Sequence, residues 1–270
     1  IDVKYIENII RKIHDNFPVA QYPEITLEAN PDDLSKEKPA ELTGAGINRL
    51  SIGVQSFRDE DLRQMNRSHN ASQAIDAVKN VQNAGIANIT IDLIYGLPQL
   101  NNASWRNNIQ QALALDVSHI SCYCLTVEPK TALAHMISMN KIPNVNEAVA
   151  SGQFEILMDE LEKEGFEHYE ISNFAKENFR SRHNSNYWNG SKYLGLGPSA
   201  HSFNGSIRRW NVSNNRLYMK SSSEKMVKHE QEKLEIKDKY NEYVMTSLRT
   251  IEGCDELKIS ANFGQKMGYF

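Results

Sequence analysis

The sequence has few cysteines, no long apolar run and no excess of positive charge. Its three cysteines, an odd number without regular spacing, exclude a disulfide-stapled scaffold and indicate a reducing compartment. No apolar run approaches the ~20 residues of a membrane-spanning helix. Lys plus Arg total 30 against 34 Asp plus Glu, a net charge of -4, so the chain lacks the basic footprint of a nucleic-acid-binding protein. These absences predict a cytoplasmic globular protein without a membrane span or a nucleic-acid partner.

The chain also lacks an initiating methionine, a signal peptide and a polar tail. It begins at Ile1 inside a pattern of apolar residues three and four positions apart, which predicts a helix over residues 1–17. It stops at Phe270 without a polar tail. We therefore expect the chain to be an internal piece of a longer protein.

Four short apolar segments predict β-strands, and helical patterns separate them. They cover residues 25–30, 49–56, 88–96 and 119–127, so their starts lie 24, 39 and 31 positions apart. This is the period of β-α units with parallel strands. Two architectures fit it, a flat doubly wound sheet and a (β/α) barrel.

Polar and apolar residues alternate along the first three predicted strands. A parallel sheet covered on both faces reads as continuous apolar runs, so the alternation favours a partial barrel with a polar inner face. Glu28, Gln55 and Asp92 fall on that face at the carboxyl ends of their strands, where barrels of this type carry function. Such a trio suits a cationic or hydroxyl-rich ligand such as a nucleoside; the alternative is structural hydrogen bonding inside the lumen.

Other polar residues have two interpretations each. Arg67, twelve residues after Gln55, suits a bidentate grip on a carboxylate, or a surface ion pair. Cys122 and Cys124 share one face of a strand, and small buried thiols explain them better than a metal site does. A barrel aldolase or isomerase is disfavoured because no predicted strand ends in a lysine.

The pattern changes after residue 127. A long helix is predicted over residues 146–164, one strand over 166–174, and a hairpin partner over 207–212; residues 221–239 read as a linker or exposed helix. We accordingly predict three parts: a partial barrel over 1–130, an α+β extension over 131–220, and a linker opening a small helical domain over 221–270.

The stretch from residue 180 to residue 203 is rich in aromatic residues, asparagine and glycine. His183 opens the motif HNxxYW in this stretch and follows two arginines. A loop histidine of this kind suits axial ligation of iron in a carboxylate-bearing macrocycle. The alternative is a loop that is packed by its own aromatic side chains.

Six segments together resemble a known family. They are ITLEANP, GINRLSIGVQSF, IDLIYGLP, LTVEP, HNSNYW and YLGLGPSAHSF, in this order along residues 25–203. The chain is similar to radical S-adenosylmethionine (SAM) proteins around oxygen-independent coproporphyrinogen III oxidase. The form of the HNxxYW motif resembles the haem chaperone branch more than the oxidase branch.

The resemblance implies a fold and a site. The family core is a partial six-stranded (β/α) barrel, so the four predicted strands correspond to strands three to six, and a first loop carries a C-x-x-x-C-x-x-C motif for a [4Fe–4S] cluster. That motif is absent from these 270 residues. Glu28, Gln55, Arg67 and Asp92 match family positions that contact SAM, and His183 is the candidate haem ligand.

The resemblance leaves two functions open. One is a haem chaperone that binds SAM and haem and passes haem to a client protein. The other is anaerobic coproporphyrinogen III oxidation, in which a radical from SAM abstracts hydrogen from a propionate chain. In either case we expect no catalytic or metal-ligating residue in this chain and no radical chemistry from it alone.

Overall fold

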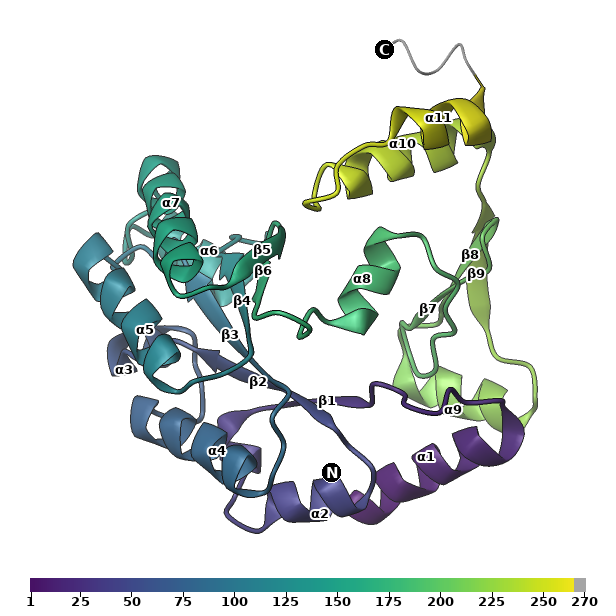
Figure 1. Cartoon of the computed structure of the whole chain (residues 1–270), viewed down its shortest axis with the longest axis horizontal. Coiled ribbons are helices and arrows are strands. Elements are labelled where there is room, and N and C mark those ends of the chain that lie inside the picture. Colours follow the sequence, from purple (N-terminus) through teal and green to yellow (C-terminus); the bar gives the residue numbers. More distant parts are fainter. Residues whose placement is uncertain (265–270) are drawn as a thin grey trace. The chain divides into compact units, whose positions relative to one another are not determined.

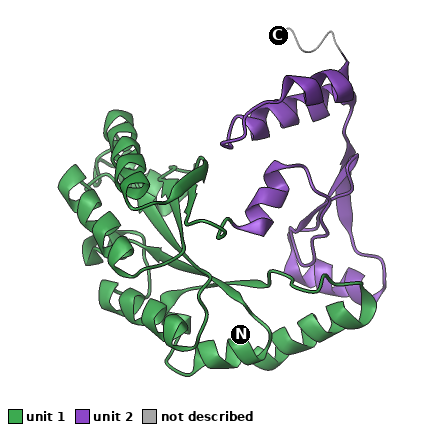
Figure 2. Ribbon diagram, in the orientation of Figure 1, with its two compact units in different colours: residues 1–180 green, residues 181–270 purple. Residues whose placement is uncertain are grey.

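The computed structural model describes residues 1–264 and divides into two compact units. Unit 1 covers Ile1–Arg180 and unit 2 begins at Ser181 (Figure 2). The predicted division into three parts at residues 130 and 220 stays a prediction. Within the described residues no helix is long and apolar enough to cross a membrane.

Unit 1 is built on one six-stranded sheet, in the order β1-β2-β3-β4-β6-β5 (Figure 1). Four strands run parallel and coincide with the four predicted segments: β1 (Thr26–Ala29), β2 (Arg49–Gln55), β3 (Ile89–Tyr95) and β4 (His119–Cys124). The predicted α/β architecture with parallel strands is therefore confirmed.

Helices connect these strands. They are α1 (Val3–Asn16), the short 3-10 helix η1 (Pro31–Asp33), α2 (Lys38–Gly44), α3 (Asp59–Gln64), α4 (Ala71–Asn83), α5 (Asn102–Ala114), α6 (Ala132–Ser138) and α7 (Glu147–Lys163). Asn101 caps helix α5: its side-chain oxygen accepts a hydrogen bond from the backbone N–H of Ser104 over 2.9 Å.

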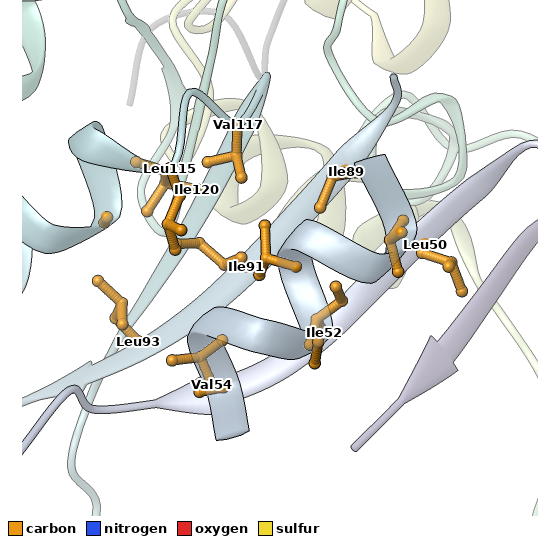
Figure 3. Packing of buried hydrophobic residues seen from close by; sticks show 14 of the residues in the cluster. Leu50, Ile52, Val54, Ile89, Ile91, Leu93, Leu115, Val117 and Ile120 are labelled. Atoms are coloured by element: carbon orange, nitrogen blue, oxygen red, sulfur yellow. The ribbon is translucent and has the colours of Figure 1, made fainter. Parts of the chain in front are cut away.

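The core of unit 1 lies between one face of the sheet and the helices. Leu50 pairs with Ile89 and Ile52 with Ile91 across β2 and β3, and all four side chains are buried (Figure 3). Because side chains alternate along a strand, burying these residues leaves the intervening positions on the opposite face. The sequence alternation that predicted a polar face is explained by this packing.

The segment predicted as one strand over residues 166–174 is a hairpin. It forms β5 (Glu167–Glu170) and β6 (Asn173–Ala175), and β6 pairs antiparallel with β4. The Glu170 carboxylate accepts a hydrogen bond from the backbone N–H of Ser172 over 3.1 Å, which holds the tight turn. A turn made by Ile171 and Ser172 carries no glycine or proline, so the sequence did not signal it.

As far as residue 264, unit 2 has a three-stranded antiparallel sheet and four helices. The strands are β7 (His201–Phe203), β8 (Ile207–Asn211) and β9 (His229–Lys233), and the helices are α8 (Arg182–Trp188), α9 (Asn215–Ser223), α10 (Ile236–Ser247) and α11 (Glu256–Phe263). The predicted hairpin of β7 and β8 is confirmed.

Two predictions in unit 2 are wrong. Residues 221–239 are not a linker or a single exposed helix, because they contain the end of α9, all of β9 and the start of α10. Strand β9 is exposed along its whole length, so it shows no apolar alternation. His183 lies on helix α8 rather than on a loop; the Ser181 hydroxyl caps that helix by accepting from the backbone N–H of Asn184.

Candidate functional site

The polar residues of the parallel strands lie on one face of the sheet. Glu28 pairs in register with Ser51, which pairs with Thr90, and Asp92 pairs with Ser121 one row further along. Residues in register on neighbouring parallel strands point to the same side. The structure therefore brings Glu28 and Asp92 to the same face, opposite the apolar core.

Asp92 is the most perturbed carboxyl group on this face. Burial raises its pKa to about 6, and the negative charge of Glu28 adds to that effect. The neighbouring Ser121 and Ser51 hydroxyls and the positive charge of Arg49 act in the opposite direction. The Ser51 hydroxyl lies 3.5 Å from Oδ1 of Asp92. The two carboxylates thus form a site that favours a positively charged ligand.

Gln55 and Arg67 converge over a glycine. Gln55 ends β2 with a φ of 69°, in the left-handed region, where the register with β3 also shifts. A Cβ atom at Gly53 would lie 2.8 Å from Nε2 of Gln55 and 3.0 Å from a terminal nitrogen of Arg67. Gly53 lies two positions after Ser51 and therefore faces the same side of the sheet. The Gln55 amide and the Arg67 guanidinium, which lie over Gly53, thus reach the polar face.

The Arg67 guanidinium is held by neighbouring groups that sequence reasoning missed. It donates to Oδ1 of Asn30 over 2.9 Å and to the backbone carbonyl of Gly53 over 3.1 Å. The buried His69 lies 3.1 Å from the carbonyl of Val54 through Nε2, which ties the Arg67 loop to β2. Asn30 follows Glu28 by two positions, and that period-two spacing was the available signal.

A cleft of about 420 Å³ opens beside these groups. Gln55 and Arg67 form part of its wall, and the apolar side chains of Ile94, Leu97 and Leu125 form another part. The combination of an apolar wall and a few polar groups is typical of small-molecule sites.

A second polar group lies along the same face toward β5 and β6. Nε2 of His119 lies 2.8 Å from the Tyr169 hydroxyl, and burial together with the nearby Arg49 charge lowers the pKa of His119 to about 3. Ser121 donates to Asn173 over 2.6 Å. These contacts explain why polar residues are tolerated inside buried strands, and they depend on the hairpin that the sequence did not reveal.

His183 belongs to unit 2 and is exposed on helix α8. Its ring packs edge-on against Tyr187 one turn later, with the ring centroids 4.9 Å apart. Among residues 1–264 no group of three or more His, Cys, Asp or Glu side chains is arranged to hold a metal ion. Of the cysteines, Cys122 is buried while Cys124 and Cys254 are exposed.

Comparison with known proteins gives the class to which this parallel α/β sheet with a polar face belongs. The radical SAM superfamily model matches residues 1–112. The structure of coproporphyrinogen III oxidase (HemN) from Escherichia coli superimposes with a TM-score of 0.82 at 21% identity, covering 97% of this chain and 63% of that one. That likeness shows a shared fold.

Sequence relatives define the group within this class. The haem chaperone HemW of Bacillus subtilis is 34% identical over 251 residues, which are 93% of this chain and 66% of the relative. A mitochondrial radical S-adenosyl methionine domain-containing protein 1 of Danio rerio is 33% identical over 73% of this chain and 44% of its own length. The chain belongs to the radical SAM superfamily and, within it, to the HemW-like group; it spans 66% of the B. subtilis protein.

Proposed function

We propose that this chain is part of a haem chaperone that binds SAM and haem and delivers haem to a client protein in the cytoplasm. The proposal is supported by the position of Glu28 and Asp92 on the polar face of the sheet and by the approach of Gln55 and Arg67 to each other at Gly53, in a chain related to HemW proteins. Haem delivery is a property of the whole protein, so this part of the proposal is based on what the relatives' names say they do.

The four side chains fit the chemistry of SAM. Glu28 and Asp92 supply carboxylates for ribose hydroxyls or positively charged groups, and Arg67 supplies a guanidinium for the methionyl carboxylate. Gly53 leaves room for the amide of Gln55, because a Cβ atom at that position would meet it. The apolar cleft next to Gln55 and Arg67 suits the flat adenine ring.

The [4Fe–4S] cluster of the superfamily does not fit the described residues of this chain. A cluster is held by several cysteine thiolates, whereas Cys122 is buried in β4 and its thiol pKa lies well above the ordinary value because of that burial. Reductive cleavage of SAM by these 270 residues is therefore not expected.

His183 is the proposed axial ligand of the haem iron. It is exposed on α8, and the Tyr187 ring beside it restricts the orientation of the imidazole. Imidazole nitrogen is a common axial ligand of haem iron.

Calorimetric titration with SAM tests the first half of the proposal. The wild-type chain should bind SAM, and Arg67→Ala should weaken binding by about tenfold, the effect of losing a charge-assisted bidentate contact. Arg63→Ala is the matched control, because Arg63 is exposed on α3 and does not line the cleft. Equal affinity of the Arg67 and Arg63 variants would contradict the assignment.

Haemin titration tests the second half. The wild-type chain should give a Soret band of bound haem, and His183→Ala should shift or remove it; an unchanged band would exclude His183 as the ligand. The alternative function, oxidation of coproporphyrinogen III, is supported only by the structural similarity to HemN. Anaerobic decarboxylation of coproporphyrinogen III by the longer natural protein would establish the oxidase function instead.

A further inference from the structure

Unit 2 contains a cleft of about 800 Å³ that the SAM site does not include. Helix α8, the hairpin of β7 and β8, and helices α10 and α11 all contribute to its wall. Six aromatic side chains line it: Tyr187, Trp188, Tyr193, Phe203, Tyr243 and Phe263. Its volume lies in the ~300–1,000 Å³ range of small-molecule pockets.

A continuous series of rings connects His183 to this cleft. The His183 and Tyr187 centroids lie 4.9 Å apart, those of Tyr187 and Tyr193 4.7 Å, and those of Tyr193 and Phe203 6.1 Å. His183 itself does not line the cleft, but the residue one helical turn later does. Ring faces and edges arranged this way favour a flat, aromatic ligand, since offset and edge-on contacts each add stabilisation.

The polar groups of the cleft indicate that the ligand carries negative charge. Arg208 and Lys239 line it with Glu242 as the opposing acidic group. Two hydrogen bonds of 2.8 and 2.9 Å join Arg208 to Glu242, whereas Lys239, among residues 1–264, donates to a neutral hydroxyl, that of Ser206, over 3.1 Å. Lys239 is therefore the cation whose charge no carboxylate within the cleft balances.

Trp188 adds an unused donor. Its indole Nε1 is buried and has no hydrogen-bond partner among the described residues, while the Arg249 guanidinium lies over its ring at 4.7 Å. A buried N–H without an acceptor costs free energy unless a ligand or water supplies one. A carboxylate or a ring nitrogen of a bound molecule would meet that need.

We propose that this cleft binds a planar tetrapyrrole. The macrocycle packs against the aromatic wall, and one propionate group forms an ion pair with Lys239. The inference rests on the proposed haem-binding function and adds the location and the recognition of the carboxylates. If the inference is right, two separate contacts hold haem: the cleft walls bind the macrocycle, and His183 ligates the iron. Changing one contact should therefore leave the other in place.

Two probes separate these contributions: haemin, and metal-free protoporphyrin IX, which has no iron to ligate. Thr246→Trp places a large ring in the cleft and should weaken binding of both probes by about tenfold or more. Asn241→Trp, exposed on the same helix and outside the lining, is its control. Lys239→Met should weaken binding of protoporphyrin IX about threefold or more, and Lys237→Met, on the opposite face of α10, should not.

The dimethyl ester of protoporphyrin IX lacks free carboxylates, so it should bind the wild type and the Lys239 variant alike. His183→Ala should change the Soret band of haem and leave the affinity for protoporphyrin IX unchanged. Circular dichroism checks that each variant is folded; Lys239→Met decides the question if Thr246→Trp is not.

Wild-type affinity of both cleft variants for protoporphyrin IX would overturn the cleft proposal, and haem binding through His183 would then stand alone. A wild-type chain that binds neither haemin nor protoporphyrin IX would overturn the proposed haem function itself. Loss of protoporphyrin IX binding in Thr246→Trp but not in Asn241→Trp, together with loss in Lys239→Met, supports the proposal.

Discussion

Asp92→Asn should stabilise unit 1 at neutral pH, although the aspartate belongs to the candidate SAM site. Burial and the neighbouring Glu28 raise the pKa of Asp92 from its ordinary 3.8 to about 6. The folded state therefore binds a proton more tightly than the unfolded state, so this group's contribution to stability is complete below about pH 4. It is lost as pH rises through about 6. Asparagine keeps the shape and stays neutral.

The magnitude follows from that difference. Roughly two pH units at 1.36 kcal/mol each correspond to about 3 kcal/mol at pH 7.5. The Asp92 side chain is partly exposed and lies beside the Ser51 and Ser121 hydroxyls, which reduces the expected gain to about 1–3 kcal/mol. Below pH 4 the variant and the wild type should be equally stable, because Asp92 is then neutral in both folded and unfolded chains.

The comparison has to be made between variant and wild type at each pH. His119, whose pKa is lowered to about 3 by burial, acts in the opposite sense: its contribution is present above about pH 6.5 and is lost as pH falls through about 3. The two slopes oppose each other between pH 4 and 6 in the wild type. Only the difference isolates Asp92.

Urea unfolding followed by tryptophan fluorescence measures this difference. Trp105 is fully buried in unit 1, and replacing Trp188 and Trp210 of unit 2 by phenylalanine leaves it as the sole reporter. Asp76→Asn, on the exposed side of α4, is the control and should change stability by less than about 0.5 kcal/mol. A variant no more stable than the control at pH 7.5 would refute the electrostatic argument.

Three further changes test other parts of unit 1. Gly53→Ala should weaken SAM binding about tenfold, because its Cβ would meet Gln55 and Arg67; calorimetry measures this, and unchanged affinity would contradict the convergence of the two groups. Leu157→Ala, at a fully buried position of α7, should cost about 2–5 kcal/mol of unfolding free energy in urea, and a cost below 1 would contradict the packing. The stability advantage of the wild type over His119→Gln should shrink as pH falls from 6.5 to 4, because only the wild type carries the imidazole that gains a proton on unfolding; a difference that does not change with pH would mean that His119 is not the responsible group.

Much of unit 1 could be predicted because its signals are local. Alternation along β1, β2 and β3 placed Glu28 and Asp92 on one face, since a period of two fixes the side of every residue in a strand. Alternation along the strand is not sufficient to predict the position of the Gln55 side chain. Its left-handed backbone and the shift of register at that point decide where the amide goes, and neither has a sequence signal.

Unit 2 was harder to predict because its elements carry little apolar periodicity. Strand β9 is polar throughout and pairs with β8 through its backbone and through polar side chains such as Glu232, which contacts Arg208, so a pattern based on hydrophobicity misses it. The HNxxYW motif lies on a seven-residue helix whose first turn contains polar residues, which resembled a loop. Pairing with β8 forms β9, and the cap at Ser181 stabilises α8. In each element a contact of this kind overrides a weak local preference.

The cost of the polar face is itself an argument for a ligand. Burial of Asp92, with the negative charge of Glu28 added to it, destabilises the charged form of this carboxylate in the unliganded fold, and the neighbouring Ser51 and Ser121 hydroxyls offset only part of that cost. A cation that binds between Glu28 and Asp92 would lower the pKa of Asp92 and remove the penalty. Such a ligand should therefore bind most tightly above about pH 6, where Asp92 is charged, and should raise the free energy of unfolding as its concentration increases. If the polar face is purely structural, the free energy of unfolding should not depend on the concentration of the ligand.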